Sequence, residues 1–90
     1  MERESQLQTK IQAYLRERGG YTVNVVRASR SGVPDILACV EGKFIGIEVK
    51  VGTNKSTLLQ EHNAKQIEKA GGIAVVIRSM AEMRDFLGDE

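Results

Sequence analysis

The sequence predicts an α/β protein in which helices flank a mixed sheet, in the order α-β-β-β-α-β-α. Three stretches carry apolar residues at helical spacing, and four short stretches are rich in apolar and β-branched residues and end at glycine or polar turns. Three consecutive strands followed by a helix and a fourth strand indicate a meander with a helical crossover, which produces a sheet with both antiparallel and parallel pairs.

The first predicted helix covers residues 4–18, and Gly19-Gly20 ends it. Its apolar stripe is formed by Leu7, Ile11, Tyr14 and Leu15. Residues 21–27 suit a strand because they are rich in β-branched side chains. Residues 28–34 are small, basic and flexible, so we expect a loop.

The next two predicted strands, 35–40 and 43–50, are joined by the two-residue turn Glu41-Gly42. A polar loop at 51–56 leads to a helix over about 57–70, where Thr57 and Gln60 have capping-box spacing.

The C-terminal part is predicted to hold one strand and one short helix. Ile73 to Ile77 is a continuous apolar run, as expected for a strand buried on both faces. Ser79 and Glu82 have capping-box spacing and mark the start of a last helix, which ends before Gly88.

The composition predicts one small domain over residues 1–90, with 41% hydrophobic residues. The net charge of +1 decides nothing about nucleic acid, because the placement of the charges matters more than their sum. No apolar run is long enough to span a membrane, and the N-terminus has no signal-peptide character. We therefore expect a soluble, cytoplasmic protein.

Cys39 is the one cysteine, so an internal disulfide cannot form. This fits a reducing compartment. Because Cys39 lies in an apolar strand, we expect it to act as a small hydrophobic residue rather than a nucleophile.

Asp35, Glu48 and Lys50 are charged residues of the predicted hairpin. Glu48 and Lys50 are two apart, so their side chains share one face of the sheet, while apolar residues fill the other. Counting outward from the turn places Asp35 opposite Glu48. Opposed carboxylates repel unless a cation lies between them, and hard divalent ions prefer carboxylate oxygens.

Glu4 lies at the centre of the apolar stripe of the first helix, whereas Glu2 falls on the solvent side. A carboxylate within an apolar stripe requires a polar partner. Helix geometry therefore favours Glu4 over Glu2 as an acid that faces the sheet and reaches a metal through water, although Glu2 remains the alternative.

These residue types suit the hydrolysis of a phosphodiester. A carboxylate-bound Mg²⁺ or Mn²⁺ ion lowers the pKa of its water and polarises the phosphoryl group. Asp35 and Glu48 are the predicted ligands. Lys50 is predicted to orient the water or to neutralise developing charge.

Each site residue also has a purely structural interpretation. Asp35 follows a proline and suits a turn, while Glu48 and Lys50 suit a solvated strand face of alternating charge. Glu4 suits the first turn of any helix, because an acid there interacts favourably with the helix dipole. Gln60 suits a capping box.

Several basic residues are candidates for contacts with a nucleic-acid backbone, with an ordinary charged surface as the alternative. They are Arg27, Arg30, Lys55, Lys65 and Lys69. Phosphate contacts of this kind give affinity and salt dependence rather than sequence specificity. The one histidine, His62, falls on a different side of its helix from Gln60, so we expect it to be exposed.

Pro34-Asp35 followed by Glu48-Val49-Lys50 resembles the PD-(D/E)xK motif of restriction-endonuclease-like nucleases. Nearly the whole chain is similar to the stand-alone VRR-NUC domain (virus-type replication–repair nuclease) of phages and bacteria. The matching segments are Gly32-Val33-Pro34-Asp35-Ile36, Gly42-Lys43-Phe44, Gly46-Ile47-Glu48-Val49-Lys50, Gln60 and Ala70-Gly71-Gly72.

The resemblance implies a restriction-endonuclease-like core and a metal-dependent active site. Its residues would be Glu4, Asp35, Glu48, Lys50 and Gln60, with the backbone carbonyl of Val49 completing the shell of a Mg²⁺ or Mn²⁺ ion. Short members of the family resemble Holliday-junction resolvases that act as homodimers. This implies four-way DNA as the partner, in a bacterial cytoplasm or phage-infected cell, with no nucleotide cofactor and no membrane.

Two alternatives remain open at this point. One is a nuclease for flaps, nicks or ends, and the other is a non-catalytic nucleic-acid-binding module on the same fold.

Overall fold

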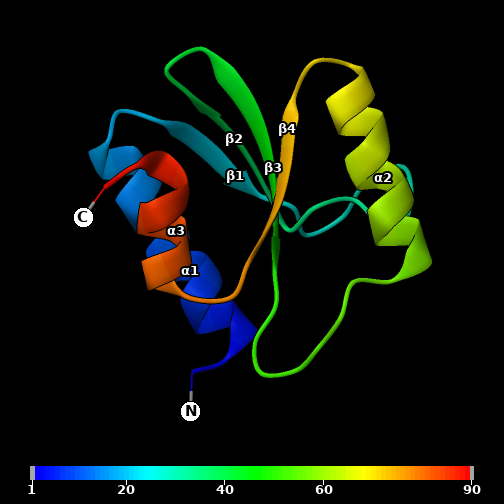
Figure 1. Ribbon diagram of the computed structural model, residues 1–90, viewed down its shortest axis with the longest axis horizontal. Coiled ribbons are helices and arrows are strands. Elements are labelled where there is room, and N and C mark those ends of the chain that lie inside the picture. The colour runs from blue at the N-terminus through cyan, green and yellow to red at the C-terminus, as the bar shows by residue number, and fades with distance from the viewer. Residues whose placement is uncertain (1, 90) are drawn as a thin grey trace.

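The structure is a computed structural model that describes residues 2–89. Its elements, shown in Figure 1, are α1 (Glu4–Glu17), β1 (Tyr21–Asn24), β2 (Ile36–Val40), β3 (Lys43–Val49), α2 (Leu58–Lys69), β4 (Ile73–Ile77) and α3 (Met80–Leu87). The predicted order of helices and strands is confirmed. None of the helices within residues 2–89 is long and apolar enough to cross a membrane.

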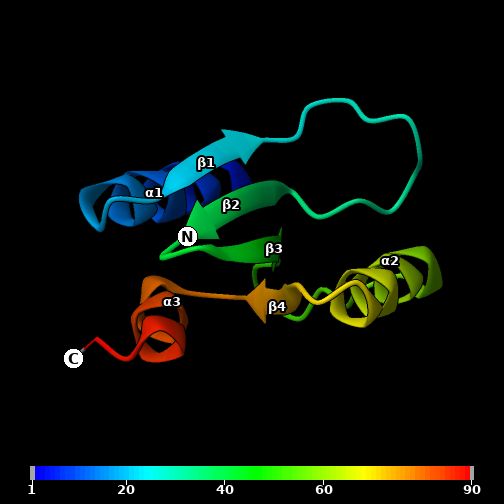
Figure 2. The ribbon, with the colours of Figure 1, turned by 90° about the horizontal axis from the view of Figure 1, so that it is seen from above.

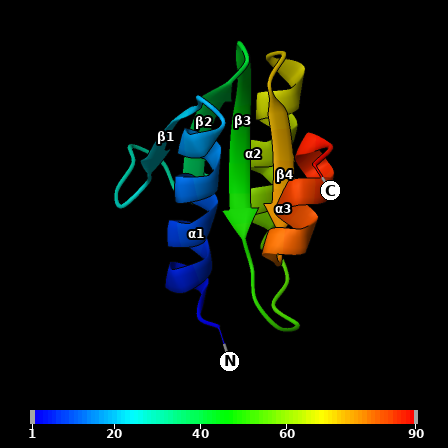
Figure 3. The same cartoon turned by 90° about the vertical axis from the view of Figure 1, so that its left-hand side faces the viewer.

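The four strands form one mixed sheet in the order β1-β2-β3-β4. β2 pairs antiparallel with β1 and with β3, whereas β3 and β4 are parallel. Figures 2 and 3 show α1 and α3 on one face of the sheet and α2 on the other. The helix between β3 and β4 is therefore the crossover that the parallel pair requires.

The hydrophobic core lies between α1, α3 and the sheet face turned toward them. Its buried residues are Leu7, Ile11, Leu15, Ile36, Ala38, Val40, Ile45, Ile47, Val49, Ile77 and Met83. Because side chains alternate along a strand, the other face of β3 carries Phe44, Gly46 and Glu48. This second face, which α2 covers only in part, positions the candidate site.

The β2–β3 hairpin has the predicted two-residue turn and register. Residues 41 and 42 have φ values of 52° and 78°, as a type I′ turn requires. The pairing runs from Val40–Lys43 to Ile36–Ile47. One further step in the same register places Asp35 opposite Glu48.

β1 and β2 are shorter than the sequence predicts. β1 ends at Asn24, three residues before the predicted end, and β2 begins at Ile36, one residue after the predicted start. One more backbone bond runs from the Val25 N–H to the Asp35 carbonyl, at 2.8 Å. The ladder stops there because Pro34 has no N–H to donate.

The prediction that β4 is buried on both faces is wrong. β4 forms the edge of the sheet and pairs with β3 alone, and its Val76 side chain is 41% exposed. A short apolar run does not by itself distinguish a central strand from an edge strand that packs under a helix.

Cys39, which we expect to act as a small hydrophobic residue of its strand, lies outside the core, because its side chain is exposed. Ala38 and Val40 on either side of it face the core, so Cys39 points to the opposite face of β2.

Both predicted capping boxes occur, one of them in altered form. Thr57 Oγ1 accepts from the Gln60 N–H at 3.1 Å, and Gln60 Oε1 accepts from the Thr57 N–H at 2.9 Å. At α3, Ser79 caps the Glu82 N–H, but the Glu82 carboxylate accepts from the N–H of Arg78 instead of Ser79.

Candidate active site

The predicted site residues gather at one end of the sheet, where β2 begins and β3 ends. The N-terminal ends of α1 and α2 lie at the same end of the molecule (Figure 1). Glu4 comes from the first turn of α1 and Gln60 from the first turn of α2, while Glu48 belongs to β3. Residues far apart in the sequence thus converge on one carboxylate.

Glu48 is the centre of this cluster and is only 7% exposed. Gln60 Nε2 donates to Glu48 Oε1 at 3.0 Å, and Lys50 Nζ lies 4.0 Å from the same oxygen. Gln60 therefore serves the capping box through its Oε1 while its Nε2 holds Glu48.

Asp35 lies beside Glu48 and is held by the backbone of β3. Its Oδ2 accepts a hydrogen bond from the Val49 N–H at 2.8 Å. The Asp35 and Glu48 side chains are also within hydrogen-bonding reach of each other. The strand end thus fixes two carboxyl groups side by side.

This crowding changes the acidity of Glu48. Burial raises the pKa of its carboxyl from 4.5 to about 8, and the charge of Asp35 and the hydrogen bond to it act in the same direction. Lys50 lowers the pKa, while Glu4 raises it further. The cluster therefore retains a proton near neutral pH unless a cation takes its place.

The two acids near the N-terminus lie in different surroundings. Glu2 is also half-buried, but it forms an ion pair with the exposed Lys10 at 2.5 Å. Glu4 is half-buried, and its charge reaches Glu48. The geometry therefore favours Glu4 as the acid associated with the cluster.

The donor set fits a partly hydrated hard cation. Within residues 2–89, no three His, Cys, Asp or Glu side chains converge closely enough to hold a metal by themselves. Asp35 and Glu48 supply two carboxylates, and Mg²⁺ typically binds proteins through one or two carboxylates while keeping several waters. The Val49 carbonyl, next to the N–H that holds Asp35, remains the predicted third oxygen donor.

Comparison with known proteins identifies the family. The family model for the archaeal Holliday junction resolvase (Hjc) matches residues 1–84. The chain belongs to the Hjc family. No curated protein gives a significant sequence match to this Hjc-family chain.

Solved structures share its fold. A protein described as a VRR_NUC domain has a TM-score of 0.82 at 23% identity, over 93% of this chain and 92% of that one. A VRR_NUC domain protein gives 0.75 at 17% identity, over 93% and 84%. Archaeoglobus fulgidus Hjc, described as a Holliday junction resolvase, gives 0.65 at 20% identity, over 83% and 67%. The predicted VRR-NUC-type, restriction-endonuclease-like fold is confirmed.

In this Hjc-family protein, a buried asparagine that the sequence analysis did not single out holds the segment leading to Asp35. Asn63 on α2 is 6% exposed, and its Nδ2 donates to the carbonyls of Ser31 at 3.1 Å and Leu59 at 2.9 Å. Gly32, with φ of +80°, packs so closely on Leu59 that a Cβ would lie 2.8 Å from its atoms. The sequence feature that could have indicated this contact is a polar residue, Asn63, on the inner face of α2.

The residues predicted to contact nucleic acid are all exposed. They are Arg27, Arg30, Lys55, Lys65 and Lys69. Arg30 Nη1 also donates to Gln66 Oε1 at 3.1 Å, which adds a second link between the 25–34 segment and α2. His62 is exposed, as predicted.

Proposed function

We propose that this Hjc-family chain is a Mg²⁺- or Mn²⁺-dependent endonuclease that cuts branched DNA, with the four-way junction as its preferred substrate. The observation that carries the proposal is the buried carboxyl of Glu48 beside that of the half-buried Asp35 and near Lys50, a pair that retains a proton unless a cation neutralises it. Membership of the Hjc family supports the choice of substrate.

Each residue has a distinct part in the proposed reaction. Asp35 and Glu48, with the Val49 carbonyl, would hold the cation, and Gln60 fixes the orientation of Glu48. A bound divalent ion supplies an acidified water and charge relief on the phosphate. Lys50 would orient the attacking water or neutralise the developing charge, and Glu4 would act on the ion through water.

A four-way junction must be cut on two opposed strands. One chain of this size carries one site, so we propose that two copies act together, related by a twofold axis. The exposed basic residues Arg27, Arg30, Lys55, Lys65 and Lys69 would bind phosphates, without selecting a sequence.

The test is a cleavage assay on labelled four-way, flap and linear DNA with Mg²⁺, Mn²⁺ or EDTA. We expect metal-dependent cleavage of the four-way substrate, and its loss in Asp35→Asn and Glu48→Gln. His62→Ala is the matched control, because this exposed side chain has no part in the site. Cleavage that persists in Asp35→Asn would contradict the assignment.

Two other results would redirect the proposal. Preferential cutting of flaps or ends would retain the chemistry and change the substrate. Binding to junctions without cleavage under every metal would favour a non-catalytic binding module on this fold.

A further inference from the structure

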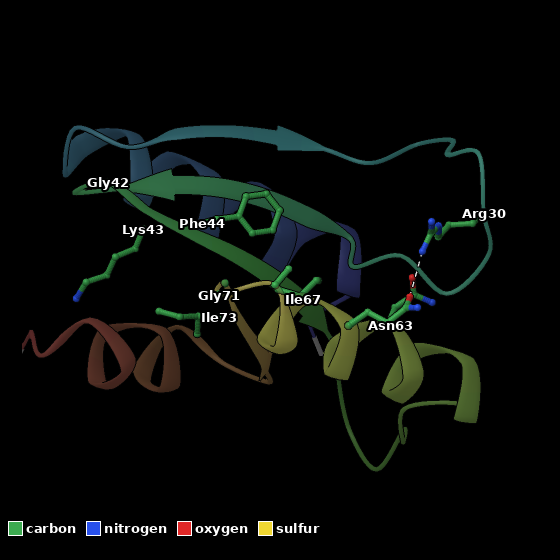
Figure 4. A pocket seen from close by; sticks show the side chains of 11 residues that line it. Arg30, Gly42, Lys43, Phe44, Asn63, Ile67, Gly71 and Ile73 are labelled. Atoms are coloured by element: carbon green, nitrogen blue, oxygen red, sulfur yellow. Dashed lines mark hydrogen bonds between the residues drawn. The ribbon is translucent and has the colours of Figure 1, made fainter.

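A groove lies between α2 and the start of β3, away from the carboxylates of the candidate site. Its volume is about 530 Å³, within the range of roughly 300–1,000 Å³ that is usual for sites enclosing a drug-sized ligand. Figure 4 shows Phe44 between Lys43 and Arg30, which lie toward opposite ends of the groove. Ile67 of α2 and the glycines 71 and 72 belong to the facing wall. The groove therefore presents an aromatic ring between two cations.

The ring of Phe44 is held at one edge and remains accessible. A Cβ at Gly72 would lie 3.0 Å from Phe44 Cδ1, so the glycine leaves room for the ring to pack against the backbone. Nothing lies within 4 Å of the position that a Cβ would take at Gly71, so the neighbouring wall is open. Phe44 is 46% exposed, whereas aromatic side chains normally supply much of a small core. The groove therefore offers a positioned ring on which a flat group can stack.

The charged residues of the groove are both basic. Among the described residues that line it, Arg30 and Lys43 carry a charge and none is acidic. Arg30 Nη1 donates to Gln66 Oε1 at 3.1 Å, which directs the guanidinium toward α2, and a guanidinium has further N–H donors for a ligand. Lys43 is exposed at the start of β3. Two separated cations with no acid between them suit a ligand that carries negative charge along its length.

The combination of cations with an aromatic ring decides which class of ligand fits. Phosphates bind cations without regard to sequence, and stacking on an aromatic ring tolerates every base, so the two features together are typical of sites for unpaired nucleic acid. A duplex keeps its bases within its own stack and does not offer their faces to a protein ring. A protein segment would match the apolar lining, but the cores of protein interfaces are depleted in charge.

We propose that this groove binds an unpaired DNA strand, with one base stacked on Phe44 and with phosphates on Arg30 and Lys43. β3 runs from Lys43 toward Glu48, a distance of roughly 16 Å at about 3.3 Å per residue. The segment that carries Arg30 leads into Asp35. A strand held in the groove therefore lies along β3 and reaches the site end of the molecule past Arg30.

The inference deepens the proposed function, on which it rests for the choice of DNA, by adding a class of substrate. A four-way junction with fully paired arms offers no unpaired base and would leave the groove empty. A forked DNA with one single-stranded arm can place its duplex at the carboxylates and its free arm in the groove. Such a fork should therefore bind more tightly than the same fork with that arm paired.

Fluorescence anisotropy in EDTA tests the groove, because binding is then measured without cleavage. The probes are an oligothymidylate, a fork with one single-stranded arm and a four-way junction with paired arms. We expect Phe44→Ala to weaken binding of the first two by roughly 5- to 150-fold, as for the loss of one stacked base, and to change binding of the junction by less than about twofold. Phe44→Trp should bind all three as the natural protein does, because it keeps an aromatic ring.

Two matched variants separate the groove from its surroundings. Tyr21→Ala removes an aromatic side chain that is 73% exposed on the same sheet face but does not line the groove, so its affinity for the oligothymidylate should be natural. Lys43→Gln should reduce the slope of log Kd against log salt for the oligothymidylate by about 0.7, as for one phosphate contact of a single strand. Lys10→Gln should leave that slope unchanged, because Lys10 pairs with Glu2.

Photo-cross-linking tests the stacking without changing the protein. An oligonucleotide that carries 5-iododeoxyuridine joins to an aromatic side chain stacked on it when irradiated, and peptide mass spectrometry should place the link at Phe44. A link only at other residues would overturn the inference. Unchanged binding of the oligothymidylate by Phe44→Ala would also overturn it and leave the groove to a protein partner. Junction cleavage without strand binding would overturn the inference alone, whereas strand binding at Phe44 without any cleavage would overturn only the proposed function.

Discussion

At the scale of single residues, Glu48 links the stability of the protein to its chemistry. Its carboxyl is buried next to that of Asp35, and a shared proton or a bound cation would relieve the repulsion between the two groups. An acid held in this way destabilises the folded chain when it is forced to ionise. A divalent ion bound by the two carboxylates would reverse the sign of that effect.

Glu48→Gln should change how stability depends on pH. Because the pKa of Glu48 is about 8 in the fold and 4.5 as a model value, the unfolded chain loses this proton first as pH rises. The free energy of unfolding should therefore fall between about pH 5 and pH 8 in the natural protein, and less in the variant. Because one pKa unit corresponds to about 1.36 kcal/mol, the two proteins should differ in their free energy of unfolding by at most roughly 5 kcal/mol. Local relaxation around Glu48 should reduce this difference to about 2 kcal/mol.

Urea unfolding at pH 5, 6, 7 and 8 in EDTA measures this dependence. Glu61→Gln is the control, since Glu61 is an exposed acid on the same helix as Gln60. Parallel curves for the natural protein and Glu48→Gln would contradict the raised pKa.

Addition of Mn²⁺ should raise the unfolding temperature, and more at pH 8 than at pH 6. The ion competes with the proton for the Asp35–Glu48 pair, and a ligand at 100 times its Kd stabilises by about 2.7 kcal/mol. Asp35→Asn and Glu48→Gln should abolish the shift in a calorimetric scan, while His62→Ala should retain it. An equal shift in all four proteins would place the ion elsewhere.

Lys50→Met should separate catalysis from metal binding. Lys50 is a positive charge beside the proposed ion and supplies no oxygen ligand, so the Mn²⁺-induced shift should persist or grow. The cleavage rate should fall by roughly 10²–10³, as for the loss of one transition-state contact. Single-turnover rates on the four-way substrate check this, and an unchanged rate would remove Lys50 from the mechanism.

At the scale of elements, α2 positions the loop that precedes Asp35. Asn63→Asp keeps the size of the side chain but replaces its donor with a carboxylate that faces two carbonyls. We expect a loss of stability of about 2–3 kcal/mol, and weaker Mn²⁺ binding because Asp35 is displaced. Titration calorimetry and urea unfolding measure the two effects.

Gln66→Ala is the matched variant for this prediction. It removes only the exposed bond to Arg30 and should change both quantities little. If Asn63→Asp binds Mn²⁺ as tightly as the natural protein does, the position of the loop does not depend on this contact.

At the scale of the whole molecule, affinity for DNA should depend on salt through the basic residues at the site end. Lys55 lies in the loop between β3 and α2, the elements that carry Glu48 and Gln60. Lys55→Ala should reduce the slope of log Kd against log salt by about 1. Fluorescence anisotropy with junction DNA and EDTA measures the slope. Lys10→Ala is the control, because Lys10 pairs with Glu2 away from the cluster, and equal slopes for all three proteins would contradict the contact.

The local signals of the sequence determined most of the fold. The positive-φ turn at residues 41–42 fixed the hairpin register, and the period of two placed Glu48 and Lys50 on one face. The Thr57–Gln60 box and the glycines that follow α1 and α2 located helix ends to within about one residue. These features depend on neighbours in the chain, so they can be read without the tertiary structure.

The tertiary structure decided what depends on contacts between distant segments. Which strand lies at the edge, and which part of the sheet α2 covers, decide the exposure of Val76 and Cys39 and the contact of Asn63 with Ser31. The raised pKa of Glu48 likewise arises from burial and from two acids distant in the sequence, Asp35 before β2 and Glu4 on α1. Local sequence patterns contain neither burial nor electrostatic proximity, because both exist only once the helices have packed on the sheet.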